Sequence, residues 1–201
     1  MIDDFGARVA SIWSELRPTT RGLVERALIS SNATPQSVGK LPYDARADIE
    51  LSRLLAALDE RAAETNARRV TDDQLQHVAD TCAAVLQERT QSAEVFVQLV
   101  KRAEKQRDYA RIDALANELV RFAPSETCEL ARSSELVIRA LADEALAQFP
   151  TGVLISLLND PVDSEMARKA LRRQALEFGS EEAREILNFL AQADVAEEEF
   201  Q

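Results

Sequence analysis

Two stretches of this chain, residues 112–124 and 138–150, are near-copies of one helical segment that ends in proline. They read IDALANELVRFAP and IRALADEALAQFP and share, without a gap, Ile112/Ile138, Ala114/Ala140, Leu115/Leu141, Ala116/Ala142, Glu118/Glu144 and Pro124/Pro150. Proline has no amide hydrogen to donate and its ring clashes with the preceding turn, so Pro124 and Pro150 mark helix boundaries. An amphipathic helix that recurs between such breaks cannot bury its apolar face alone, and we therefore expect stacked helical units.

A third copy follows the second at a shift of thirty residues. It matches Ser134, Glu135, Leu136, Ala140, Leu141, Ala145 and Leu146 with Ser164, Glu165, Met166, Ala170, Leu171, Ala175 and Leu176. The spacing between copies is not constant, and chance matching of Ala and Leu is the alternative explanation. If each copy is the second helix of a pair, the first helices cover roughly residues 92–105, 126–132 and 152–158. A final helix at about 181–192 would pack Ile186, Leu187, Phe189 and Leu190 on the end of the array.

The composition favours helix throughout the chain. Ala, Leu, Glu, Arg and Gln, which lose little side-chain entropy in a helix, dominate it, whereas only five Gly and six Pro interrupt it. Alternating runs rich in Val, Ile and Thr, which are typical of strands, are absent. The 46% of hydrophobic residues is enough for a continuous core. We predict an all-α fold of stacked antiparallel helix pairs, either an α-solenoid or an irregular helical bundle.

The regularity of the helical pattern changes along the chain. Residues 1–66 carry uneven apolar stripes, with a loop-like stretch at 30–42 and a long amphipathic helix from Asp44 onward. The next helix starts most clearly, because Thr71 and Gln74 form a capping box. We predict an irregular N-terminal helical region at 1–66, a helical-repeat region at 70–192 and an acidic tail at 193–201, with one continuous domain as the alternative.

The charge and cysteine content limit the partners and the compartment. A formal net charge of −11 argues against general affinity for nucleic acid or anionic membrane, since both require clustered Lys and Arg. No signal peptide and no apolar run of membrane-spanning length are visible. Cys82 and Cys128 lie far apart, a pattern that suits a reducing compartment. We therefore predict a cytoplasmic protein, and the excess of Arg over Lys favours a bacterial source.

The chain lacks the motifs of most catalytic and cofactor sites. His77 is its one histidine, so a two-histidine metal site cannot form within one chain, and no Gly-rich phosphate loop or nucleophile elbow is present. Acidic pairs such as Asp72–Asp73 and Glu181–Glu182 fall in the first turns of expected helices, where the helix dipole favours acids. We predict no catalytic residues, no metal ligands and no cofactor.

One segment carries a family resemblance. Residues 154–161, LISLLNDP, followed by residues 164–171, SEMARKAL, resemble a HEAT-type repeat, and the resemblance centres on residues 152–178. In that family the first helix ends in Leu-Leu, an Asp-Pro turn follows, and the second helix has Arg and Ala at fixed offsets. Those places are occupied here by Leu157, Leu158, Asp160, Pro161, Arg168 and Ala170. The resemblance implies an α-solenoid that serves as a binding scaffold.

We therefore expect a non-catalytic scaffold or adaptor for an unidentified protein partner, with self-association as a further possibility. The expected binding surface takes polar residues from successive second helices: Arg111, Asn117, Arg139, Asp143, Arg168 and Arg172. Two alternatives remain open. One is an enzyme whose site between helices uses acids and arginines without a motif. The other is a regulatory nucleic-acid-binding protein that uses residues 20–41 as a degenerate helix-turn-helix, although basic residues are scarce there.

Overall fold

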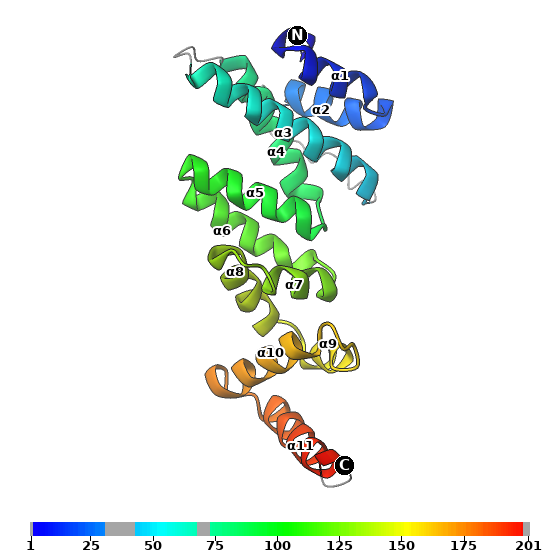
Figure 1. Cartoon of the computed structure of the whole chain (residues 1–201), viewed down its shortest axis with the longest axis vertical. Helices are drawn as coiled ribbons and strands as arrows, with labels where there is room; N and C mark the ends of the chain where they lie inside the picture. Colours follow the sequence, from blue (N-terminus) through cyan, green and yellow to red (C-terminus); the bar gives the residue numbers. More distant parts are fainter. Residues whose placement is uncertain (1, 31–42, 68–72, 199–201) are drawn as a thin grey trace. The chain divides into compact units, whose positions relative to one another are not determined.

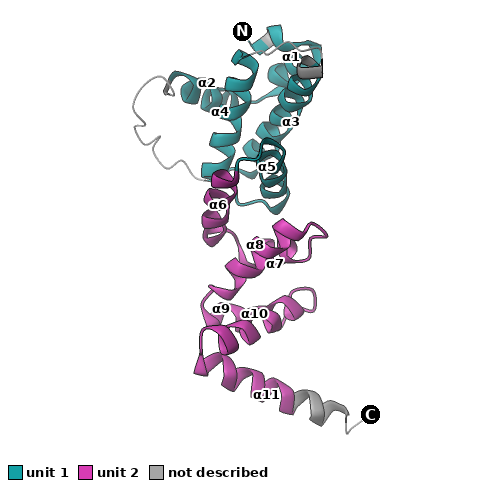
Figure 2. Cartoon of the chain, turned by 90° about the vertical axis from the view of Figure 1, so that its left-hand side faces the viewer, with its two compact units in different colours: residues 1–108 teal, residues 109–201 magenta. Residues whose placement is uncertain are grey.

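The computed structural model describes residues 2–30, 43–67 and 73–198, and within those ranges every regular element is helical (Figure 1). The predicted all-α fold of packed helix pairs is thereby confirmed. The chain divides into two compact units, residues 1–108 and 109–201, which we call unit 1 and unit 2 (Figure 2). A division between residues 66 and 70, as the sequence suggested, would separate two helices that pack against each other inside unit 1.

In its described residues, unit 1 has a short 3₁₀ turn and five α-helices. They are η1 (Ile2–Phe5), α1 (Ala7–Glu15), α2 (Pro18–Ser30), α3 (Ala45–Ala67), α4 (Asp73–Arg89) and α5 (Ala93–Gln106). The helices α3 and α4 form the central pair, with α1 against α3, α2 against α4 and α5 in contact with both members of the pair. The loop predicted at 30–42 and the cap at Thr71 lie largely or wholly outside the described residues.

The core of unit 1 follows the helical spacing of its leucines. On α3 the side chains of Leu51, Leu54, Leu55 and Leu58 are almost completely buried, and they recur every three or four residues along one face. The same spacing buries most of the apolar face of α4 and α5, including Phe96 on α5. Ile49 of the same helix is apolar but 59% exposed, so it lies beyond the edge of that face.

Polar side chains fix the corner between α1, α2 and α3. Asp44 accepts hydrogen bonds from the backbone N–H groups of Arg46 (3.0 Å) and Ala47 (3.2 Å), and so caps the start of α3. Glu50, one turn into α3, accepts from the Arg17 guanidinium at 2.8 Å and from the Thr20 hydroxyl. Desolvation opposes its ionisation, yet these hydrogen bonds hold the pKa of Glu50 below its usual value.

Unit 2 is a succession of short helix pairs that ends in one longer helix. Its elements are α6 (Tyr109–Glu118), η2 (Leu119–Arg121), α7 (Pro124–Ala131), α8 (Leu136–Ala147), α9 (Thr151–Leu157), α10 (Ser164–Glu177) and α11 (Glu181–Glu198). The predicted first and second helices agree with these bounds to within a few residues. Pro124 is the first residue of α7 and Pro150 immediately precedes α9, so both prolines mark helix boundaries as predicted.

The helices of unit 2 pack in the order of the chain. The helix α7 lies against α8, α9 against α10, and α10 against both α8 and α11 (Figures 1 and 2). Gln174 of α10 ties the layers together, because its buried amide donates to the backbone oxygens of Ala147 (3.1 Å) and Phe149 (2.7 Å) at the end of α8. A buried amide that is paired in this way fixes the register of α10 on α8.

Burial changes the register of the predicted third copy. The shift of thirty residues places Leu146 opposite Leu176, but Leu146 is 1% exposed and Leu176 is 84% exposed. The buried positions instead match at a shift of twenty-nine, which aligns Ile138, Ala142 and Leu146 with Ala167, Leu171 and Ala175. Several of the sequence identities between these two copies therefore reflect the abundance of Ala and Leu and not equivalent places in the core.

The Asp-Pro turn between α9 and α10 is held by its own acids. Asp160 accepts from the Val162 N–H through its side chain (2.8 Å) and from the Ser164 N–H through its backbone oxygen (2.8 Å). The buried Asp163 carboxylate accepts from Arg132, the residue after α7, at 2.6 Å. This ion pair joins the Asp-Pro turn to the turn between α7 and α8.

Candidate interaction surface

The six residues expected to form a binding surface lie on three helices of unit 2, two residues on each. Arg111 and Asn117 are on α6, Arg139 and Asp143 on α8, and Arg168 and Arg172 on α10. Arg111 and Asn117 are six residues apart, which places them on different faces of α6, since a helix turns by about 100° per residue. The six residues therefore do not form one uniform stripe along unit 2.

The two residues on α8 are engaged within unit 2. The Arg139 guanidinium donates to the backbone oxygen of Ser133 at 2.9 Å, near the start of α8. The Asp143 carboxylate accepts from the Lys169 ammonium at 2.6 Å, and an adjacent ion pair joins Glu144 to Arg173. The charges of α8 thus help to hold α10 in place.

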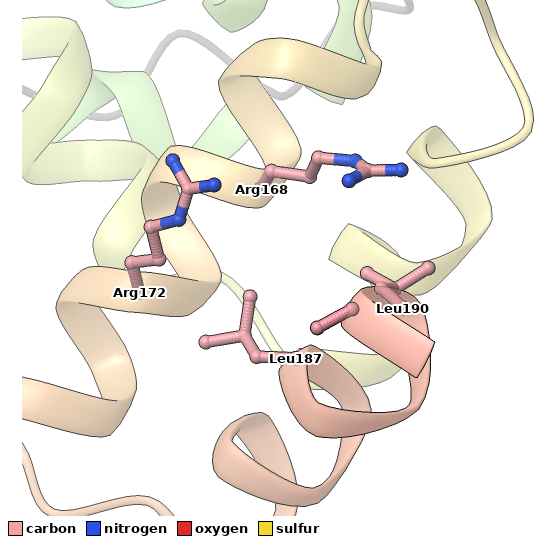
Figure 3. Close-up of a pocket in the computed structure, with 5 residues that line it drawn as sticks. Arg168, Arg172, Leu187 and Leu190 are labelled. Carbon is pink, nitrogen blue, oxygen red and sulfur yellow. The ribbon is translucent and has the colours of Figure 1, made fainter. Parts of the chain in front are cut away.

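Arg168 and Arg172 are the pair that the structure brings together with apolar side chains. They line a hollow of about 180 Å³ whose other walls are Leu187, Leu190 and Ala191 of α11 (Figure 3). Arg168 is half-buried and Arg172 is exposed, and they lie one turn apart on α10. Two guanidinium groups therefore stand beside an apolar floor.

The hollow exists because of the way α10 ends and α11 begins. Gly179 adopts a left-handed φ of 67°, and the N–H of Ser180 donates back to the oxygen of Gln174 at 3.0 Å, which closes the C-terminal turn of α10. The Ser180 hydroxyl then accepts from the Ala183 N–H at 3.2 Å and caps α11. Ala183 near this corner is fully buried, whereas Leu187 and Leu190 further along α11 are only half-buried. The space between the helices is therefore less filled away from the corner.

Phe189 corrects the prediction that the final helix packs its apolar residues on the end of the array. Its side chain is 72% exposed, and Ala183 is the one side chain classed as buried among residues 181–192 of α11. The sequence showed that α11 is amphipathic but not how its apolar residues divide between two faces. Hydrophobic spacing alone does not reveal that division, because it depends on which side α10 covers.

A second charged cluster lies inside unit 1. Arg102 of α5 is buried, and its guanidinium donates to Asp59 of α3 (3.0 and 3.1 Å), Asp80 of α4 (2.8 Å) and Gln106 (3.2 Å). Desolvation raises the pKa of Asp59, although the adjacent Arg102 charge opposes that shift. Acids and an arginine between helices are the combination expected for an enzyme that lacks a recognisable sequence motif. Its polar groups are turned toward one another, and the arrangement ties three helices together.

The described residues also include two cysteines and a histidine. Cys82 and Cys128 are free and buried, and burial raises the pKa of their thiols to about 12 and about 11, so both are protonated at neutral pH. His77 is exposed on α4. No group of three potential metal ligands occurs within residues 2–30, 43–67 and 73–198.

A second concavity, a groove of about 300 Å³, lies in unit 1. Phe5, Val9 and Ala57 supply apolar walls, and its charged walls carry two ion pairs, Arg8 with Glu60 and Arg61 with Glu64. Both arginines of this groove are thus already matched by acids from α3. The α10–α11 hollow differs in that two arginines from one helix, Arg168 and Arg172, line it together with leucines of the next helix.

Comparisons with family models, with curated proteins and with solved structures find no match to this chain. The fold itself defines the class, which is an all-α protein of packed neighbouring helix pairs. Within the described part of the chain, no helix combines the length and the apolar character needed to span a bilayer.

Proposed function

We propose that this chain is a non-catalytic protein-interaction scaffold with HEAT-like helical repeats, and that it docks a partner at the α10–α11 hollow. The observation that carries the proposal is the pairing of Arg168 and Arg172 with an apolar floor of Leu187 and Leu190 (Figure 3). Binding surfaces draw most of their affinity from a few apolar anchors and arginines that become buried on contact. The hollow supplies both kinds of group.

The HEAT-like part of the proposal is supported by the second half of the chain. There, α9 and α10 form a pair joined by a turn in which the Asp160 side chain accepts a backbone hydrogen bond from Val162. This gives the Asp-Pro turn a structural reason: the aspartate closes the turn, and proline favours the extended backbone before it. The pair also packs on the preceding α7–α8 pair, as expected for a stacked array.

The hollow also limits the chemistry of the partner. Its volume of about 180 Å³ suits a large apolar side chain but not a folded domain or a large cofactor. Guanidinium groups favour carboxylates, with which they form paired hydrogen bonds. An amphipathic helix that presents one large apolar residue, with Glu or Asp three or four residues away, supplies both features on one face.

A pair of synthetic helical peptides tests this proposal. The first carries Leu at positions i, i+3, i+4 and i+7 with Glu between them, and the second has Lys in place of each Glu. We expect fluorescence anisotropy to show binding of the acidic peptide only, with an affinity that falls as salt is added. The double variant Arg168→Ala/Arg172→Ala should weaken this binding by about tenfold, given about 0.7 kcal/mol for each of two partly exposed ion pairs.

Arg26→Ala is the matched control, because Arg26 is an exposed arginine on α2 of unit 1. It should leave the affinity unchanged. Equal binding of the acidic and basic peptides, or equal binding by the double variant and the native chain, would refute the proposed docking site. Circular dichroism of each variant confirms that the helices are intact before binding is compared.

A further inference from the structure

The helix α11 presents acidic and apolar residues together on the side that faces away from α10. Phe189 is 72% exposed there, and Glu182 and Glu185 are exposed as well. With about 100° per residue, both glutamates lie within roughly 40° of Phe189 around the helix axis, with Ile186 next to them. A large apolar side chain with neighbouring carboxylates is also what the α10–α11 hollow is proposed to bind.

The opposite side of α11 forms part of that hollow. Leu187 and Leu190 point toward the space beside Arg168 and Arg172 (Figure 3). One hairpin, α10 with α11, therefore carries both a receptor and its matching ligand on different faces. A receptor and its matching ligand on different faces of one chain give a head-to-tail contact, in which one copy supplies the hollow and the other supplies the acidic and apolar face.

The position of α11 in unit 2 adds a second argument. It is the last helix of the described array, and its main neighbour is α10. Terminal helices of stacked arrays need a polar outer face to remain exposed to water. The outer face of α11 has Phe189 at its centre, and Leu176 and Phe178 near the same corner are 84% and 56% exposed. This side of α11 therefore presents an apolar side chain that no described helix covers.

We propose that the hollow is occupied by α11 of a second copy of this chain, in a head-to-tail dimer. This inference rests on the proposed docking role of the hollow and names its occupant. The Phe189 side chain of one copy enters the hollow of the other, and Glu185 of the first copy pairs with Arg172 of the second. A net charge of −11 makes two copies repel, so an interface that brings arginines against glutamates is the arrangement that lowers this repulsion.

Sedimentation velocity and light scattering of the full chain test the dimer. We expect a mass of about twice 22.3 kDa at tens of micromolar, rising further with concentration because a head-to-tail contact lets another copy add at either end. Phe189→Glu should give the monomer, since it places a carboxylate where the aromatic ring is buried. Ile29→Glu is the matched control, because Ile29 is also an exposed apolar side chain, 73% exposed, but lies on α2 of unit 1. That variant should remain dimeric.

A charge exchange tests the orientation. Arg172→Glu and Glu185→Arg should each weaken the dimer by about tenfold or more, and the double variant should recover most of the affinity because the opposite charges are restored in reverse.

A native chain that stays monomeric at several hundred micromolar, or a dimer that survives Phe189→Glu, would overturn the inference. If the native chain is monomeric but still binds the acidic peptide, the docking role stands and only its occupant is wrong. If the chain dimerises through Phe189 but binds no added acidic peptide even as a dissociated monomer, the peptide-docking role fails instead.

Discussion

Asp48 is a carboxylate that folding removes from water without pairing both of its oxygens. The residue is 3% exposed in the first turn of α3, and its Oδ2 has no hydrogen-bond partner. Desolvation raises its pKa, although hydrogen bonds from the Thr90 and Tyr43 side chains oppose the shift. At neutral pH, Asp48 is therefore a net cost to the stability of unit 1.

The direction of the Asp48 pKa shift predicts how Asp48→Asn changes the free energy of unfolding. Because the folded-state pKa is raised, protonation of Asp48 stabilises the native state at low pH, and that stability is lost as the pH rises through the folded-state pKa. Asparagine does not titrate, so the variant should gain up to about 1 kcal/mol at pH 7, since one pKa unit corresponds to 1.36 kcal/mol. The loss of a favourable acid in the first turn limits the gain. Urea unfolding at several pH values measures it.

The gain from Asp48→Asn should shrink as the pH falls through the raised folded-state pKa of Asp48, because the native carboxyl then becomes protonated. Glu25→Gln, at an exposed position on α2, should show neither the gain nor its pH dependence. A variant that is less stable than the native chain at pH 7 would mean that the Asp48 charge is better solvated than its burial indicates.

Arg102 acts at the scale of helices, because one side chain links α3, α4 and α5. Its side chain is 5% exposed, whereas its partners Asp59 and Asp80 keep 30% and 47% of their side-chain exposure. Arg102→Met keeps much of the apolar stem and removes the charge. We expect a loss of about 2–3 kcal/mol, at or below the low end for a broken buried ion pair, since water still reaches both acids. Urea unfolding at pH 7 gives the value.

The loss caused by Arg102→Met should be smaller at acid pH and in the variant that also carries Asp59→Asn and Asp80→Asn. Both changes remove the carboxylates that the missing guanidinium leaves uncompensated. Arg53→Met is the control, because Arg53 is 62% exposed and pairs with Glu15 at 3.6 Å, so its loss should change stability by less than about 0.5 kcal/mol. Equal losses of stability in Arg53→Met and Arg102→Met would contradict the proposal that Arg102 stabilises the packing of α3, α4 and α5.

The elements that were predictable from sequence are those with a local cause. Pro124 and Pro150 fixed helix boundaries because the loss of an N–H acts wherever the helix lies, and the leucine spacing of α3 fixed its buried face. The register between α8 and α10 was not predictable in this way. It depends on Gln174, whose hydrogen bonds reach residues about twenty-five positions away in the chain.

The candidate site was predictable only in part, for the same reason. Arg168 and Arg172 were expected on the second helix of the last pair, and they are there. Asp143 was expected to face a partner but accepts from Lys169, because that cation comes from a neighbouring helix. The apolar half of the site, Leu187 and Leu190, required knowledge of where α11 diverges from α10.

At the scale of the whole molecule, the proposed dimer makes stability depend on concentration. Only folded chains associate, so mass action draws the unfolding equilibrium toward the native state as the protein concentration rises. A tenfold increase contributes ~1.4 kcal/mol for each dimer. Shared between two chains of this size, this is a rise of roughly 2 °C in Tm. Differential scanning calorimetry at several concentrations measures it.

The division of the chain into two units sharpens this expectation. The helix α11 belongs to unit 2, so where calorimetry resolves two transitions, only the transition of residues 109–201 should move with concentration. Phe189→Glu should make both transitions independent of concentration, and Ile29→Glu should leave the dependence intact. A Tm that does not rise with concentration in the native chain would show that association gives no net stability. A shift confined to residues 1–108 would instead place the interface in unit 1, away from the hollow.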